Sequence, residues 1–267
     1  MIGAIIGDVV GSRFEFQNHL SKKFDFFAPG CEFTDDTVMT CAVAQALLDC
    51  DGDYTHLYDK AVSAMQRIGQ AFPNAGYGAR FVYWVFADKP MPYNSYGNGS
   101  AMRISPVGFA ATSMEEVRYL AGEVTRVSHN HPEGMKGAEA TAAAIFLARE
   151  GRSKQEIRRY IEDNYYALDK SVDDYYRKWN GHGAEICQIS VPQALTCFFE
   201  GEDYEDVIRN CISIGGDSDT IAAIAGGIAE AYFGVPGNFR QEVRSYLDPS
   251  LVEITDAFRE KFMGTGG

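Results

Sequence analysis

Two short acidic clusters stand far apart in this 267-residue sequence, and each comes directly before a run of apolar residues. The first acidic cluster is Thr34-Asp35-Asp36-Thr37, and the second is Gly215-Gly216-Asp217-Ser218-Asp219-Thr220. Neighbouring carboxylates repel each other unless positive charge lies between them. A fold of this chain must therefore either leave both clusters at hydrated helix starts or supply them with cations.

Each cluster alone has an ordinary structural interpretation at the start of a helix. Thr34 suits an N-cap, and acids in a first helical turn interact favourably with the helix macrodipole, by ~0.3–1 kcal/mol each. The same holds for Asp217, ahead of the alanine-rich segment 221–232. A cap needs only one or two acids, however, and the glycine pair before Asp217 lets the backbone turn tightly into a site.

A shared metal site accounts for the excess of acids. The four aspartates of the two clusters balance the charge of two divalent cations, and two threonines add neutral oxygen ligands. Waters or substrate would complete six-coordinate shells around Mg²⁺ or Mn²⁺. We therefore predict two Mg²⁺ or Mn²⁺ ions held by Thr34, Asp35, Asp36, Asp217, Asp219 and Thr220. Capping and metal binding are compatible, because first helical turns can point their oxygens into one cleft.

Other metal motifs fail when they are checked against the sequence. An EF-hand beginning at Asp217 would have Ile221 and Ala222 at its fifth and sixth positions, where an oxygen ligand and a glycine are needed. The Asp-x-Asp-x-Thr motif of haloacid-dehalogenase-type phosphatases fails because Thr220 comes one residue early. The sequence has no cysteine and histidine group with zinc spacing.

Helical periodicity predicts an all-α fold. Ser113 with Glu116 and Ser153 with Glu156 match the capping box that begins many helices. We interpret the apolar run 81–86 as buried helix rather than strand. Because helices average ~11–12 residues, we expect roughly ten to thirteen of them. With no internal repeat or linker, they should form a single domain over residues 1–267.

The composition excludes several classes of partner. The net charge of −13 argues against nucleic acid and anionic membrane surfaces. The six cysteines have no C-x-x-C spacing and lie in apolar stretches, as buried free thiols do in a reducing cytosol. No apolar run approaches the ~20 residues of a membrane span, and the apolar segment 1–7 lacks the basic start of a signal peptide. We expect a cytoplasmic monomer.

Several segments carry a family resemblance. They are residues 3–11, Glu15, and residues 34–37, 77–79, 96–103, 128–134, 190–194, 215–220 and 225–234. With these segments in this order, the chain resembles the ADP-ribosylglycohydrolases. That group includes dinitrogenase reductase-activating glycohydrolase and the hydrolases of ADP-ribosyl-arginine and ADP-ribosyl-serine. Each segment alone is a weak signal, whereas six or more in the family's order are specific.

The resemblance implies an orthogonal multi-helix fold with a central cleft that holds the two ions. It also implies that Glu15 lies near the metals, where it either gates the cleft or transfers a proton. Glycines before a possible helix start suit an anion, so loop 97–100 is expected to bind a diphosphate. Arg103, just past this loop, is expected to be a structural cation. The ligand-binding candidates are Gly97, Asn98, Gly99, Ser100, Met102 and His129. The catalytic candidates are Glu15, Asp35 and Asp36.

The implied activity is hydrolysis that removes ADP-ribose from a modified protein side chain or a small acceptor. Glycosidic cleavage passes through an oxocarbenium-like transition state, and metal ions would hold the ribose and activate water. Asp35 or Asp36 would orient that water or stabilise the developing cation. We favour the arginine N-glycosidic linkage, while serine or another O-linked acceptor stays open. Two alternatives also stay open: a two-metal nucleotide phosphohydrolase and a non-catalytic ADP-ribose-binding relative.

Overall fold

The computed structural model describes residues 1–178 and 185–264, which form helices and loops. The α-helices are α1 (Ile2–Gly11), α2 (Asp35–Cys50), α3 (Leu57–Ala71), α4 (Ala79–Val85), α5 (Gly99–Met102), α6 (Ser105–Ala110), α7 (Met114–Thr125), α8 (Pro132–Arg149), α9 (Lys154–Asn164), α10 (Val172–Lys178), α11 (Cys187–Glu200), α12 (Tyr204–Ser213), α13 (Ser218–Phe233), α14 (Gly237–Val243) and α15 (Pro249–Phe262). Three 3₁₀ helices are η1 (Ser12–Phe14), η2 (Tyr54–His56) and η3 (Arg244–Tyr246). The described residues contain no strand, only an isolated antiparallel bridge between Gly97 and Ile186. The predicted all-α class is confirmed.

The number of helices was predicted wrongly. The described residues form fifteen α-helices, because five of them (α4, α5, α6, α10 and α14) have only four to seven residues. Such short helices fall well below the average length of ~11–12 residues on which the expectation rested. The apolar run 81–86 is helical as predicted: α4 holds it up to Val85, and Phe86 is the C-cap.

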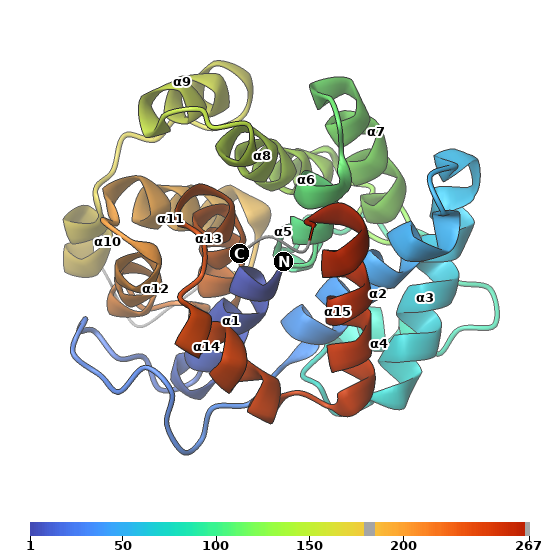
Figure 1. Ribbon diagram of the computed structural model, residues 1–267, viewed down its shortest axis with the longest axis horizontal. Helices are drawn as coiled ribbons and strands as arrows, with labels where there is room; N and C mark the ends of the chain where they lie inside the picture. Colours follow the sequence, from blue (N-terminus) through green and yellow to red (C-terminus); the bar gives the residue numbers. More distant parts are fainter. Residues whose placement is uncertain (179–184, 265–267) are drawn as a thin grey trace.

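Helix α13 occupies the centre of the fold. Every residue from Ser218 to Glu230 is buried, which is typical of a helix surrounded by other helices. Helices α1, α8, α11 and α12 all pack on it. Figure 1 shows α1 and α13 in the middle of the molecule with the other helices around them.

The backbones of α1 and α13 are in direct contact. A Cβ atom added to Gly7 would lie 2.1 Å from the carbonyl oxygen of Ala222, and one added to Gly11 would lie 2.5 Å from Cα of Asp219. These glycines are four residues apart and therefore share one face of α1. Because Gly11 ends α1 and Asp219 lies in the first turn of α13, the helices run antiparallel. The contact brings the end of α1 to the second acidic cluster.

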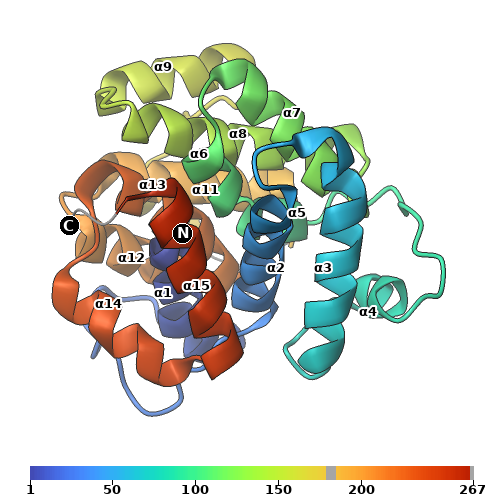
Figure 2. The ribbon, with the colours of Figure 1, turned by 45° about the vertical axis from the view of Figure 1, so that its right-hand side comes forward.

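Helix α2 carries the first acidic cluster to the same place. It packs against α1, and α3 and α15 flank it, as Figure 2 shows. Thr34 is its N-cap, as predicted, and the Thr34 hydroxyl accepts a hydrogen bond from the backbone N–H of Asp36. The N-termini of α2 and α13 thus meet beside α1.

The two predicted capping boxes differ in the structure. Ser153 and Glu156 form the complete reciprocal box. Ser113 caps α7 by accepting a hydrogen bond from the backbone N–H of Glu116. The reciprocal hydrogen bond, from Ser113 to the Glu116 carboxylate, was predicted wrongly. The Glu116 carboxylate instead accepts from Thr112, at 2.7 Å from its N–H and 2.6 Å from its hydroxyl. Thr112, through its N–H and its hydroxyl, takes the place that Ser113 would hold in a complete box.

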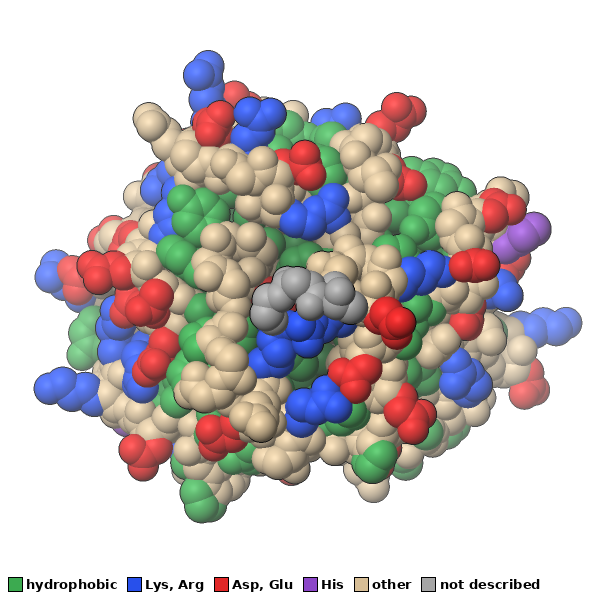
Figure 3. Space-filling model, viewed as in Figure 1, with side chains coloured by type: hydrophobic (Ala, Val, Ile, Leu, Met, Phe, Trp, Pro, Cys, Tyr) green, Lys and Arg blue, Asp and Glu red, His purple; other side chains and the backbone are tan. Residues whose placement is uncertain are grey.

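The surface and the cysteines are consistent with the composition. All six cysteines are buried and unpaired. No helix in the described ranges is long and apolar enough to cross a membrane. Acidic and basic side chains are interspersed on the face seen in Figure 3. The single domain over residues 1–267 stays a prediction, and residues 179–184 and 265–267 lie outside the described part.

Replacing Gly7 with alanine is expected to destabilise the protein by ~1–3 kcal/mol, the usual cost of overpacking a core. The added methyl group would meet backbone atoms of α13, which no rotamer change can move aside. Urea unfolding measures the effect. Gly237→Ala in α14 is the matched control, because its added Cβ would have no atom within 4 Å. Equal stability of the two variants would contradict the backbone contact.

Candidate active site

The two acidic clusters meet at the N-termini of α2 and α13. The Thr220 hydroxyl donates a hydrogen bond to Asp36 Oδ2 at 3.1 Å, which links the second cluster to the first. Two groups of three acids each have carboxylate oxygens within 4.8 Å of one another: Asp8, Asp36 and Asp219, and Glu15, Asp217 and Asp219. Since both groups contain Asp219, five carboxylates surround one place in the fold.

Asp8 joins α1 to the first turn of α2. Its carboxylate is fully buried and accepts hydrogen bonds from the backbone N–H groups of Thr34 and Thr37, both at 3.0 Å. It also accepts from both threonine hydroxyls. These four donors fix the start of α2 against α1. We did not predict this role from the sequence, although Asp8 is the only charged residue in the apolar segment 1–11.

Burial and mutual repulsion make four carboxyl groups of the site difficult to ionise. Burial, followed by the charges of neighbouring carboxylates, raises the pKa of Asp35 to about 8 and that of Glu15 to about 7. The same causes, in the same order, raise the pKa of Asp36 and of Asp219. None of these four acids forms an ion pair with a cationic side chain in the described part of the chain. Arg80 and Arg103 also line the cleft, but neither forms an ion pair with these four acids.

The donor atoms fit divalent cations. All six predicted ligands are carboxylates or hydroxyls at the starts of α2 and α13, and such hard oxygens suit Mg²⁺ and Mn²⁺. Asp36 Oδ1 is buried without a hydrogen-bond partner, which is unusual for a charged group. A cation would satisfy it. The Thr34 hydroxyl donates to Asp8 and accepts from the N–H of Asp36, which leaves one lone pair for a ligand.

A cleft of about 470 Å³ opens beside the acidic clusters. Most of the predicted site residues line it: Glu15, Asp35, Asp36, Gly97, Asn98, Gly99, Met102, His129, Asp217, Asp219 and Thr220. Thr34 and Ser100 do not. Ser100 is buried, and its hydroxyl donates to the carbonyl oxygen of Gly134 at 2.8 Å, so this side chain holds the loop in place.

The glycine loop 97–100 forms one wall of the cleft and is tied to the second acidic cluster. Its backbone is held by a bond from Asn98 N–H to the carbonyl oxygen of Glu185, at 3.1 Å. The Asn98 side chain donates through Nδ2 to Asp217 Oδ2 at 2.6 Å. One amide group thus connects the expected diphosphate loop to an expected metal ligand.

His129 lies against this loop and is buried. Its Nε2 is 3.2 Å and 3.6 Å from the positions that Cβ atoms on Gly99 and Gly97 would occupy. The two glycines therefore leave room for the imidazole ring. Burial, followed by the charge of Arg103, lowers the pKa of His129 well below its ordinary value, so the ring is neutral.

The segment that carries Glu15 is also tied to the second cluster. Asn18 Nδ2 donates to the carbonyl oxygens of Gly216 at 2.8 Å and of Glu15 at 3.2 Å, and Gly216 N–H donates to Asn18 Oδ1 at 3.1 Å. Glu185 lines the cleft as well, and burial, followed by the charge of Asp217, raises its pKa. We predicted neither Asn18 nor Glu185, and no motif in the sequence marks them.

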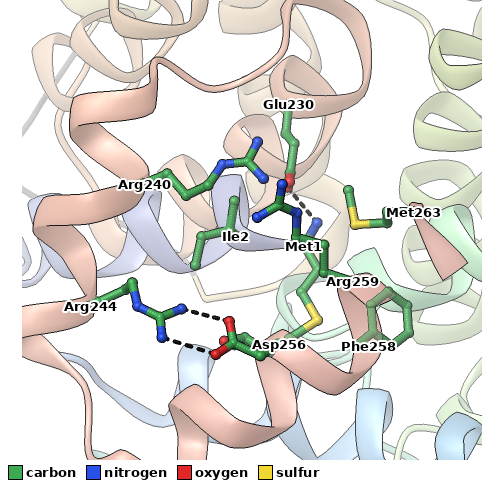
Figure 4. A pocket seen from close by; sticks show the side chains of 10 residues that line it. Met1, Ile2, Glu230, Arg240, Arg244, Asp256, Phe258, Arg259 and Met263 are labelled. Carbon is green, nitrogen blue, oxygen red and sulfur yellow. Dashed lines mark hydrogen bonds and ion pairs between the residues drawn. The ribbon is translucent and has the colours of Figure 1, made fainter. Parts of the chain in front are cut away.

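A second cavity, near the N-terminus, is too small to compete with the cleft. It lies between α1, α13, α14 and α15, and its volume of about 30 Å³ has room for roughly one water molecule. Figure 4 shows the Met1 amino group bonded to Glu230 and an ion pair between Arg244 and Asp256, at 2.6 Å. The cleft beside the acidic clusters is the candidate active site, because most of the predicted site residues line it.

Comparisons with known proteins identify the family of the chain. The family model for ADP-ribosylglycohydrolase matches residues 1–266. The human ADP-ribosylhydrolase ARH3 is 27% identical, over 94% of this chain and 90% of that protein. The ADP-ribosylarginine hydrolase Tri1 of Pseudomonas putida is 26% identical, over 89% of this chain and 70% of that protein. A solved structure described as an ADP-ribosylglycohydrolase-related protein complex has a TM-score of 0.68 at 22% identity and covers 96% of this chain and 95% of its own, which shows a shared fold. Because the family model spans nearly the whole chain, the protein belongs to the ADP-ribosylglycohydrolase family and is a hydrolase.

Proposed function

We propose that this protein removes ADP-ribose from a modified side chain or small acceptor, with the help of two divalent cations. The observation that carries the proposal is the meeting of the two acidic clusters beside a cleft with a glycine loop. A net charge of −13 makes an anionic ligand unfavourable unless cations and backbone N–H groups receive it locally. The two acidic clusters would bind the cations, and the glycine loop would offer the backbone N–H groups.

The proposed ligands of the two cations are Thr34, Asp35, Asp36, Asp217, Asp219 and Thr220. When bound, Mg²⁺ or Mn²⁺ ions supply Lewis acidity to the ribose hydroxyls and to the attacking water. All six proposed ligand residues are present in the sequence, which argues against a relative without catalytic activity. The protein's own oxygens orient the reactants, because the first turns of α2 and α13 fix them.

Glu15 is the proposed residue for proton transfer or for closing the cleft. Its carboxyl group is half-buried, lines the cleft and has a pKa raised to about 7 by burial and by the charge of Asp217. Its place beside Asp217 and Asp219 puts a group that can give and take protons within reach of a ligand held there. Asp35 and Asp36 would orient the attacking water or stabilise positive charge that develops on the ribose.

The acceptor is proposed to be arginine, with serine or another O-linked side chain as the second candidate. One relative is an ADP-ribosylarginine hydrolase, and this similarity supports the choice. We also propose that the protein is cytoplasmic and monomeric. Its six buried, unpaired thiols are compatible with a reducing compartment.

Peptides that carry ADP-ribose on arginine or on serine test the activity directly. We expect free ADP-ribose as the product in Mg²⁺ or Mn²⁺, faster from the arginine peptide, and none in excess EDTA. Chromatography separates the products. Release of AMP or inorganic phosphate without ADP-ribose would instead support a two-metal nucleotide phosphohydrolase.

Replacing Asp219 with alanine should remove at least one of the two metal ions, because this carboxylate belongs to both acid groups. We expect the rate of ADP-ribose release to fall by more than the ~10–100-fold typical of residues that only support metal ligands. Calorimetry with Mg²⁺ and the peptide assay measure the two effects. Asp163→Ala, at an exposed position in α9, is the control. A fully active Asp219→Ala variant would contradict the binuclear site.

The stability of the metal-free protein should fall as the pH rises. The carboxyl groups of Asp8 and Asp35 have pKa values raised to about 6 and about 8, against ~4 in an unfolded chain. Between these values the folded state binds more protons than the unfolded state, so raising the pH favours unfolding. We expect a lower melting temperature at pH 8.5 than at pH 5.5 in EDTA, and Mg²⁺ should stabilise more strongly at pH 8.5.

Asp35→Asn serves as the matched variant for this experiment. It removes one of the titrating groups and should flatten the dependence of the melting temperature on pH in EDTA. Greater stability of the metal-free wild type at pH 8.5 than at pH 5.5 would contradict the proposed accumulation of carboxylates.

A further inference from the structure

Arg103 is a buried cation that lines the same cleft as Asp35, with no carboxylate of the described residues within ion-pair distance. Its side chain is 1% exposed, and it forms no ion pair with a carboxylate in the described part of the chain. Burial lowers the pKa of this guanidinium to about 10, which still leaves it protonated at neutral pH. Burying an unpaired charge is costly, so a structural cation at this position calls for an explanation. The sequence predicted the structural cation but not what it supports.

The contacts of Arg103 lead to His129 through one hydroxyl group. Arg103 Nη2 donates to Ser128 Oγ at 2.8 Å, and Ser128 Oγ lies 2.8 Å from His129 Nδ1. Arginine can only donate hydrogen bonds, so Ser128 Oγ is the acceptor in the first contact. Ser128 is fully buried, and no other side chain or carbonyl among the described residues accepts its hydroxyl proton. The proton of Ser128 is therefore directed to Nδ1 of His129.

This direction of hydrogen bonds determines the tautomer of the ring. If Nδ1 accepts a proton from Ser128, it carries none of its own, and the single proton of a neutral imidazole lies on Nε2. Nε2 is the ring atom next to the glycine loop, 3.2 Å from the position of a Cβ on Gly99. No protein atom accepts a hydrogen bond from it in the described residues. It is a donor available to a ligand in the cleft.

We propose that Arg103 and Ser128 are positioning residues that hold His129 as the Nε2–H tautomer, so that the ring donates one hydrogen bond to a diphosphate oxygen of ADP-ribose. The ligand in this statement rests on the proposed function. The two glycines leave space for the ring, and the arginine charge opposes a second proton on it. His129 therefore acts as a neutral donor.

The tautomer can be measured in the free protein. In long-range ¹H–¹⁵N spectra of the whole ¹⁵N-labelled chain at pH 7.5, with His129→Gln for assignment, wild-type His129 should show a protonated Nε2 and an unprotonated Nδ1. Ser128→Ala should give a mixture of both tautomers. A wild-type ring protonated on Nδ1, or a Ser128→Ala ring that stays fully Nε2–H, would overturn the proposal.

Binding of ADP-ribose supplies the second readout. With Mg²⁺ present, Ser128→Ala should weaken the affinity for ADP-ribose in proportion to the fraction of rings that lose the Nε2–H tautomer, about 2-fold for an even mixture. The affinity for Mg²⁺ itself should not change. Ser105→Ala is the matched control: Ser105 is also buried, but its hydroxyl has no partner, and both readouts should match the wild type.

The remaining outcomes separate the two proposals. Arg103→Met should disturb the tautomer as Ser128→Ala does, and Ser128→Ala keeps the test usable if Arg103→Met fails to fold. A wild-type protein with the expected tautomer and no affinity for ADP-ribose would overturn the proposed function together with the ligand named here. The wrong tautomer in a protein that binds ADP-ribose would overturn the positioning role alone.

Discussion

The site depends on the direct backbone contact between α1 and α13. Glycines on one face of α1 allow this approach, and the approach places the end of α1 against the second acidic cluster. From the same helix Asp8 reaches the first turn of α2 and holds it with four hydrogen bonds. One short helix thus brings together two segments that are about 180 residues apart in the chain. The packing comes first, and the concentration of charge follows from it.

Gathering these carboxylates lowers the stability of the folded protein but prepares a site for a ligand. Burial, followed by the charges of neighbouring carboxylates, raises the pKa values of Glu15, Asp35, Asp36 and Asp219, and none of these four acids forms an ion pair with a cationic side chain of the described residues. Natural proteins tolerate such conflicts chiefly where a ligand resolves them. The surrounding fold packs closely: α13 is buried from Ser218 to Glu230, and several neighbouring helices pack on it.

The sequence predicted the local features of the site and missed the long-range ones. Thr34 was recognisable because a cap and its helix are adjacent in the chain, whereas Asp217 occupies the N-cap position of α13 without a capping hydrogen bond from its side chain. The charge of the clusters pointed to cations. Asp8 and Asn18 act through hydrogen bonds to residues 26 and 198 positions away, and no local pattern records such partners. The predicted hydrogen bond from Ser113 to the Glu116 carboxylate was wrong, because Thr112 competes with Ser113 for that carboxylate. The helix count was too low because short helices leave little periodicity.

The hydrogen bond from Asn98 to Asp217 means that the two halves of the site are energetically linked. A cation that orients Asp217 also orients the amide that holds the glycine loop, and a ligand that orders the loop also orders the carboxylate. Such coupling is reciprocal by thermodynamic necessity. If both ligands bind as proposed, the affinity of the cleft for the nucleotide sugar would depend on whether cations occupy the acidic clusters, and therefore on the concentration of free cation.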